Sequence, residues 1–292
     1  MTRETGPYSR DRLPPVLDLL ERVWGERPDA EELDWWYGGD AAPALLSVER
    51  DGDRALGVAA MSLVRVRAGG AAAVAAMPLG VATDPAARGR GIFSALELAN
   101  EDAAAATAPL GVTFPNAASK RVFLSSLGWR VLARRRVWAA PPLLRLRPTP
   151  PDVVVLDEVP PEADELAPRD DGPLVDARYL TWRYVDSPRQ YRLLGALRGG
   201  RLAALVAVRP ARGRVATVCH ALGETRALAR LLRALGGPRP RVALVPAGRR
   251  RAFLAAGFVP TPRTLVVLGK ELRGDARFEA PWRFELGDFD VF

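Results

Sequence analysis

Cysteine and histidine are almost missing from the 292 residues of this chain, since Cys219 and His220 are the only ones. One cysteine cannot form an internal disulfide, and a structural zinc site needs about four Cys or His ligands. We therefore interpret these two adjacent residues as a buried structural pair. We expect no metal site.

Long hydrophobic runs are lacking too. The alanine-rich stretch from Ala71 to Met77 is bounded by Gly70 and Pro78, which leaves it too short to span a membrane. The first residues, Met-Thr-Arg-Glu-Thr-Gly-Pro, do not follow the charged and then apolar pattern of a signal peptide. We expect no membrane contact and a cytoplasmic location.

Lysine is scarce as well, because Lys120 and Lys270 are the only lysines among 42 basic residues. A net charge of +8 ordinarily suggests a polyanionic partner. The arginine bias, together with 26 glycines and 26 prolines, is typical of GC-rich codon usage, so part of the charge need not reflect function. Aromatic residues also do not alternate with the arginines as in a surface that stacks single strands. We expect no nucleic-acid partner, and the oligomeric state stays open.

The chain length and an internal repeat both indicate two domains. A composition of 48% hydrophobic and 26% charged residues is typical of a globular protein, and the length is enough for two cores. The segment Leu33-Asp34-Trp35-Trp36-Tyr37 resembles Leu180-Thr181-Trp182-Arg183-Tyr184, which begins 147 residues later. Farther on, Leu127-Gly128-Trp129 resembles Ala256-Gly257-Phe258 at a shorter offset of 129. The turn glycines Gly52 and Gly200 are 148 residues apart, so the second copy has lost about nineteen residues between this turn and the second landmark.

Hydrophobic periodicity predicts the same order of elements in both copies. In the first copy we expect helices at 11–24, 92–106 and 117–126, with strands at 45–49, 55–66, 74–83, 111–114 and 129–138. In the second we expect strands at 192–197, 202–208, 214–218, 242–245 and 264–268, with helices at 224–235 and 249–256. Hairpins followed by alternating strands and helices predict an α/β (mixed α+β) protein. Each copy should hold a mixed, largely antiparallel sheet flanked by helices.

The loop from Thr83 to Phe93 carries the clearest chemical signal. It follows a strand, opens a helix and contains Arg88-Gly89-Arg90-Gly91. The two glycines permit a close backbone approach, and the amides at the helix N-terminus, including that of Ile92, attract anions. A plain glycine turn would look similar, so the motif gains weight only from its surroundings.

Those surroundings resemble the GNAT superfamily of N-acetyltransferases. The order of strand, Arg-Gly-x-Gly loop and helix, then Phe114-Pro115-Asn116, Ser119 and a Leu-Gly-aromatic ending at Trp129, covers about residues 12–138. The resemblance implies an acetyl-CoA site made by the following residues: Val81, Ala82, Thr83, Arg88, Gly89, Arg90, Gly91, Ile92, Phe93, Asn116 and Ser119. It also implies that the strand end at 81–83 diverges from its neighbour and offers backbone groups to the thioester.

Two departures from the family pattern stand out. Many relatives carry a tyrosine three residues before the Leu-Gly-aromatic leucine, where it can protonate the leaving thiolate, but this chain has Leu124 there. Phe93 stands where many relatives have a third glycine, and we interpret it as packing on the helix. Asn116 could equally act only as the cap of the next helix.

The second copy lacks the cradle, because only Cys219 to Gly223 separate its strand from its helix. We thus expect a GNAT acetyl-CoA-binding domain at 1–148, a linker at 149–173, a degenerate GNAT-like domain at 174–272 and a docked tail at 273–292. The tail ends in aromatics around Asp288 and Asp290. We expect it either to pack on a hydrophobic edge or to bring these carboxylates to the first domain's cleft as proton acceptors.

The expected activity is acetyl-CoA-dependent N-acetylation of a primary amine on a small molecule, such as an amino sugar or an amino-acid derivative. Two alternatives stay open. A catalytically idle acyl-CoA-binding or scaffold protein is favoured by the missing tyrosine, and acetylation of tRNA or protein is favoured by the arginine excess.

Overall fold

The computed structural model describes residues 1–142, 150–210, 215–274, 276–279 and 281–289. The chain divides into two compact units. Unit 1 comprises Met1–Ala133 and Val266–Pro281, and unit 2 comprises Arg134–Leu265 and Trp282–Phe292. No helix in the described ranges is both long and apolar enough to cross a membrane.

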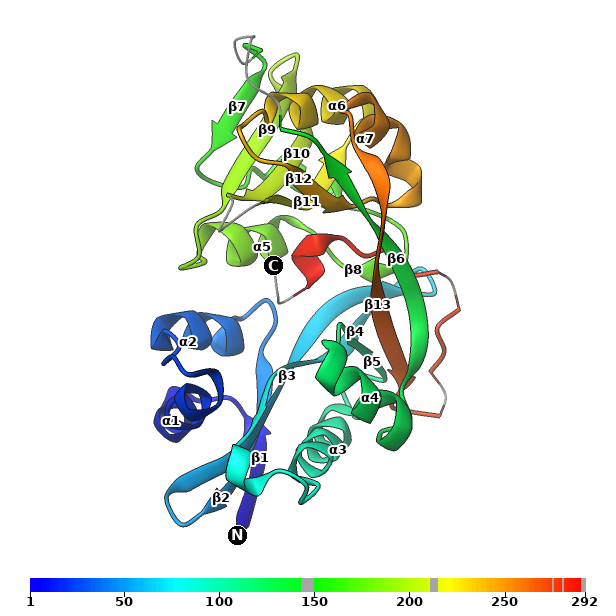
Figure 1. Ribbon diagram of the computed structural model, residues 1–292. Coiled ribbons are helices and arrows are strands. Elements are labelled where there is room, and N and C mark those ends of the chain that lie inside the picture. The colour runs from blue at the N-terminus through cyan, green and yellow to red at the C-terminus, as the bar shows by residue number, and fades with distance from the viewer. Residues whose placement is uncertain (143–149, 211–214, 275, 280, 290–292) are drawn as a thin grey trace. The chain divides into compact units, whose positions relative to one another are not determined.

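Unit 1 is a mixed, mostly antiparallel sheet with helices on both faces (Figure 1). Its strands lie in the order β1-β2-β3-β4-β5-β13, and only the β4–β5 pair is parallel. The elements are β1 (Thr2–Pro7), α1 (Leu13–Trp24), α2 (Ala30–Gly38), β2 (Ala44–Asp51), β3 (Arg54–Ala68), β4 (Ala71–Thr83), α3 (Ile92–Ala104), β5 (Leu110–Thr113), α4 (Ala117–Ser126) and the end of β13 (Val259–Glu271).

The two faces of this sheet are built by the alternation of small apolar residues along β3. Val58 and Ala60 pack with the leucines of α1 and with Trp36 and Tyr37 of α2. Ala59, one residue along, packs instead with α3. The helices α1 and α2 therefore cover one face and α3 covers the other.

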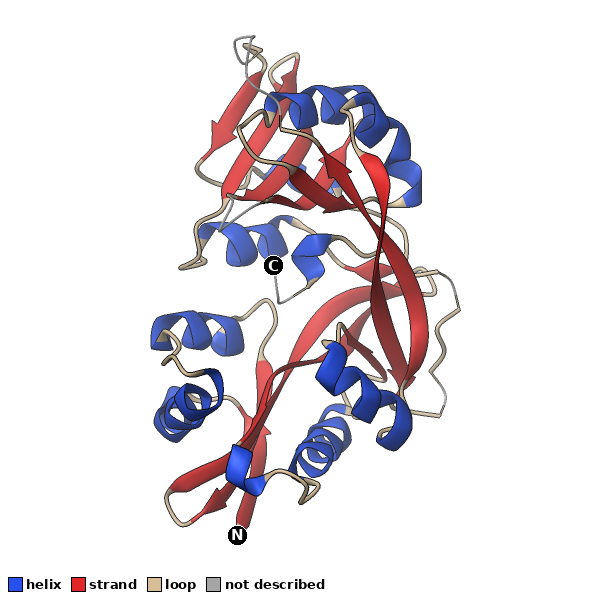
Figure 2. Ribbon diagram, viewed as in Figure 1, coloured by secondary structure: helices blue, strands red, loops and turns tan. Residues whose placement is uncertain are grey.

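Unit 2 repeats this plan with a shorter chain. Its strands lie in the order β6-β12-β11-β10-β9-β7, and only β11 and β12 run parallel. Figure 2 shows helices on both faces of this sheet as well. The elements are β6 (Arg130–Ala140), β7 (Val153–Leu156), β8 (Gly172–Pro173), α5 (Ala177–Leu180) with a π-helical turn at Thr181–Val185, β9 (Arg192–Arg198), β10 (Arg201–Arg209), β11 (Ala216–Gly223), α6 (Thr225–Ala234), β12 (Arg241–Leu244), α7 (Arg250–Ala255) and β13.

The predicted fold class is confirmed, and the expected order of elements recurs in each unit. The periodicity missed β1, α2, β7, β8 and α5. The residues of β1 are exposed or half-buried, so the strand has no apolar alternation to reveal it, and its pairing with β2 defines it. The strand β7 lies inside the stretch 149–173 and pairs with β9.

The strands β6 and β13 each extend beyond their expected ranges, and each pairs with a strand of the other copy of the repeat. β6 follows α4 of the first copy, yet its residues Val137 to Ala140 pair with β12 of unit 2. β13 follows α7 of the second copy, yet Leu268 to Glu271 pair with β5 of unit 1. The repeat in the sequence could not reveal this exchange, because equivalent strands offer equivalent edges. The predicted domain boundaries describe the repeat and stay a prediction.

Candidate functional site

The strand β4 leaves its parallel neighbour β5 before it ends. Pairing between them is confined to Ala75 and Ala76 opposite Leu110 and Gly111. Pro78, two residues farther along β4, has no backbone N–H to donate to a neighbouring strand. The β3–β4 register shifts between Leu79 and Ala82, and Gly80 lies there with φ +57°. Because the pairing with β5 ends at Ala76, the strand end at 81–83 is paired, among the described residues, on one side only, with β3.

A buried carboxylate anchors the loop that follows. Asp84 is 3% exposed, and its Oδ1 accepts a hydrogen bond of 3.0 Å from the amide of Ala86 in the 3₁₀ turn Pro85–Ala87. Its Oδ2 pairs with Arg54 at 2.8 Å and with Arg22 at 3.2 Å. The Arg54 contact and the other donors hold the pKa of Asp84 below its ordinary value, so the group stays ionised. Sequence reasoning placed Asp84 in the loop but missed its anchoring role.

The glycines of the loop adopt left-handed backbone conformations with open space before them. Gly89 has φ +79° and Gly91 has φ +73°, and a Cβ at either position would meet nothing within 4 Å. Gly91 is the N-cap of α3. The first amides of α3 have no carbonyl partner within the helix, and the helix dipole makes this end positive. Arg88 and Arg90 lie within the loop, each directly before one of its glycines, and are exposed.

Ile92 and Phe93 begin α3 on its packed side. Ile92 is buried with Leu56 and Leu96. The ring of Phe93 meets Phe123 of α4 edge to face, with 5.5 Å between centroids. Ile92 can therefore offer a ligand only its backbone, whereas the ring of Phe93 is half-buried; its contact with Phe123 agrees with the packing interpretation.

A second helix N-terminus follows β5. Asn116 caps α4, because its Oδ1 accepts a 2.9 Å hydrogen bond from the amide of Ser119. The Ser119 hydroxyl lies 3.2 Å from the same oxygen. Since the carboxyl ends of parallel strands share one edge of a sheet, the loop after β4 and the start of α4 lie at the same edge. Leu124 on α4 is 38% exposed.

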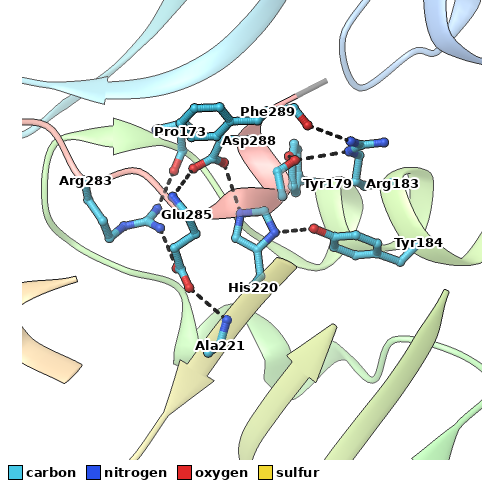
Figure 3. Close-up of polar contacts among 11 residues, drawn as sticks. Pro173, Tyr179, Arg183, Tyr184, His220, Ala221, Arg283, Glu285, Asp288 and Phe289 are labelled. Carbon is cyan, nitrogen blue, oxygen red and sulfur yellow. Dashed lines mark hydrogen bonds and ion pairs between the residues drawn. The ribbon is translucent and has the colours of Figure 1, made fainter. Parts of the chain in front are cut away.

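The tail is divided between the units: residues 273–274 and 276–279 belong to unit 1, and residues 282–289 belong to unit 2 (Figure 3). Asp288 is 5% exposed. Its Oδ2 accepts a hydrogen bond of 2.7 Å from the amide of Glu285, and its Oδ1 lies 3.0 Å from His220 Nε2. Glu285 Oε2 in turn accepts a hydrogen bond of 2.9 Å from the amide of Ala221. Both oxygens of Asp288 thus have partners within unit 2. Asp290 lies outside the described residues.

The second unit has no loop comparable to that after β4. β11 runs through Cys219 to Gly223, five residues beyond the expected strand end, and α6 begins at Thr225 after the single residue Glu224. Cys219 and His220 are both buried. Over the described parts of the chain, no three His, Cys, Asp or Glu side chains gather as metal ligands would.

Part of the chain matches a known family. Residues 5–132 match the family model described as an acetyltransferase (GNAT) domain. The comparison with curated protein sequences gave no match.

Solved structures share the fold over almost the whole chain. A GCN5-related N-acetyltransferase from Anabaena variabilis is 13% identical with a TM-score of 0.70, over 93% of this chain and 73% of that one. One from Kribbella flavida is 17% identical with a TM-score of 0.66, over 93% and 72%. A tandem GNAT protein from the clavulanic acid biosynthesis pathway is 18% identical with a TM-score of 0.60, over 94% and 100%.

Residues 5–132 thus carry an acetyltransferase (GNAT) domain, and this match indicates an acyltransferase. The resemblance predicted from the sequence is confirmed over that range, and the solved structures share the fold of almost the whole chain.

Proposed function

We propose that unit 1 binds acetyl-CoA and transfers its acetyl group to a primary amine of a small molecule, such as an amino sugar or an amino-acid derivative. The family typically uses acetyl-CoA as co-substrate. The observation that carries the proposal is the loop after β4, with Gly89 and Gly91 in left-handed conformations and open space in front of both. A diphosphate fits the unpartnered amides at this helix start.

Once the two substrates are aligned, acetyl transfer needs few side-chain groups. The amine nitrogen attacks the thioester carbonyl, the C–N bond forms, the C–S bond breaks, and the amine loses one proton to a base. Backbone groups of 81–83, with Asn116 and Ser119 at the start of α4, would align the thioester. Leu124 supplies no proton, so the thiolate would leave without the acid that many relatives carry.

The degenerate copy, residues 174–272, would then bind no acetyl-CoA. Its direct passage from β11 into α6 leaves no loop for a diphosphate. The tail carboxylates Asp288 and Asp290 stay proposed as proton acceptors for the amine. The partners of Asp288 in unit 2 argue at the same time for a docking role.

A catalytically idle acyl-CoA-binding protein is the second candidate, and Leu124 favours it. Counting thiol released from acetyl-CoA across a panel of amines, together with a calorimetric titration of acetyl-CoA, separates the two. Turnover with one site per chain supports the proposal; binding without turnover supports the idle protein.

The loop itself is tested by Gly91→Val, with Gly25→Val as matched control. Gly25 follows α1 with φ +80° and equally open surroundings, so a substitution there causes comparable backbone strain. Gly25 lies far from the loop in the sequence. We expect Gly91→Val to weaken acetyl-CoA binding at least tenfold, about 1.4 kcal/mol, and Gly25→Val to leave binding unchanged. Equal affinity of the two variants would remove the loop from the site.

A further inference from the structure

A tyrosine from α2, Tyr37, lies against the bulge of β4 at Gly80. An ideal Cβ built on Gly80 would collide with the Tyr37 hydroxyl and lie 3.2 Å from its Cζ. Tyr37 is 1% exposed, and its other side meets Tyr8 edge to face at 5.5 Å between centroids. Its ring therefore fills the volume above the one residue of β4 that has positive φ.

Unit 2 keeps the same two positions but fills them differently. Tyr184 is the counterpart of Tyr37 in the repeat. His220 is the counterpart of Gly80, because each lies two residues before the strand residue paired with Val58 in β3 or with Leu205 in β10. Val58 and Leu205 are themselves 147 residues apart, the offset of the tyrosines. Val58 packs in the same cluster as Tyr37, and Leu205 packs in the same cluster as Tyr184.

The counterpart in unit 2 is closed by side chains and by the tail. The Tyr184 hydroxyl hydrogen-bonds to His220 Nδ1, and Asp288 contacts the other ring nitrogen (Figure 3). A Cβ on Gly287 would collide with both the Tyr184 hydroxyl and the imidazole. The tail is thus packed against the tyrosine and histidine without spare volume. The equivalent residues of unit 1 present a bare glycine under a tyrosine ring.

We propose that Tyr37 is a positioning residue for acetyl-CoA. The proposal rests on the acetyl transfer proposed above. The ring of Tyr37 holds Gly80 in its left-handed conformation, and the resulting bulge sets the direction of the backbone of 81–83, which the thioester would meet. Tyr37 acts through Gly80 and through the strand and does not itself touch the reacting atoms.

The repeat supplies a matched control for the experiment. Tyr37→Leu and Tyr184→Leu remove equally buried rings at equivalent helix positions, but only the first lies over the strand with the loop. Acetyl-CoA is titrated into each full-length variant by calorimetry, below the unfolding transition measured for each. We expect the Kd to rise at least fivefold for Tyr37→Leu and to stay within twofold for Tyr184→Leu.

Two further variants keep the test decisive. Tyr37→Phe retains the ring and should bind acetyl-CoA within twofold of the wild type. Tyr37→Met preserves most of the volume and replaces Tyr37→Leu if the latter does not fold; it should also weaken binding at least fivefold. In steady state, the KM for acetyl-CoA should rise while the KM for the amine does not.

The outcomes are distinct. An unchanged Kd in the folded Leu or Met variant, an equal loss in Tyr184→Leu, or a loss in Tyr37→Phe as large as in Tyr37→Leu would each overturn the positioning role. A wild-type protein that binds no acetyl-CoA at all would instead refute the proposed function.

Discussion

Two neighbouring glutamates of α3 show how far burial alone can set the state of a residue. Glu101 accepts a 2.7 Å hydrogen bond from Trp129 Nε1 and pairs with Lys270, so its charge is compensated. Glu97, one turn earlier, is 0% exposed, and neither carboxylate oxygen finds a hydrogen-bond partner among the described residues. Desolvation, and then the charge of Glu101, raise the pKa of Glu97 well above its ordinary value.

The shift makes stability depend on pH at this residue. Glu97 holds its proton in the folded state at pH values where the unfolded chain has released it, so folding binds a proton and stability falls as pH rises. The contribution is complete below the unfolded pKa of about 4.3 and is lost as pH rises through the folded pKa.

We therefore expect Glu97→Gln, which is neutral at every pH, to escape this loss. The Tm of the variant should exceed that of the wild type by an amount that grows between pH 5 and pH 8. Thermal unfolding followed by circular dichroism measures it, with the exposed Glu158→Gln as control. A difference that stays constant across this range would show that Glu97 does not titrate with folding.

At the scale of elements, the site consists of two helix starts placed beside diverging parallel strands. α3 begins at a glycine N-cap that provides no side-chain hydrogen bond, which leaves its amides to a ligand. α4 begins at Asn116, whose side chain already satisfies the amide of Ser119. The two helix starts are therefore not equivalent, because the cap of α4 has a structural duty that the cap of α3 lacks.

The substitution Asn116→Asp separates capping from ligand binding. An aspartate keeps the oxygen that caps α4 but loses the amide N–H₂ and adds a negative charge. We expect an unchanged or slightly higher Tm and a raised KM for acetyl-CoA. Asn116→Ala should instead lower stability by about 1 kcal/mol. If Asn116→Asp has the KM of the wild type, Asn116 only caps α4.

At the scale of the molecule, one structural plan occurs twice and is used in two ways. The additional residues of unit 1 form the loop between β4 and α3. Unit 2 omits that loop and packs the tail against its sheet, with Trp282, Phe284, Leu286 and Phe289 all buried. The tail also carries Arg283, whose Nη1 lies 2.9 Å from Glu285 Oε1, so its charges are paired where they are buried.

The substitution Asp288→Asn tests whether the tail only docks or also takes part in transfer. It removes a charge that accepts from Glu285 and contacts His220, so we expect a loss of about 1–2 kcal/mol in the free energy of unfolding, measured in urea. A proton-acceptor role predicts in addition a fall in kcat at temperatures where the variant is fully folded. Normal kcat in the folded variant leaves docking as its only role, and Asp157→Asn, on the surface, serves as control.

The sequence alone determined the fold class, the repeat and the loop from Thr83 to Phe93, because hydrophobic periods, glycine spacing and turn residues act over short stretches of chain. It also predicted that the second copy lacks the loop, although β11 proved longer than expected. Whether the predicted residues act in catalysis is still a matter for experiment.

Only the tertiary structure decided the rest. The exchange of β6 and β13, the anchoring of Asp84 by Arg22 and Arg54, and the tyrosine over Gly80 all join residues far apart in the chain. Such contacts depend on which strand edges meet and which faces are covered. Short-range periodicity carries no information on those choices, since several edges of similar composition could pair equally well.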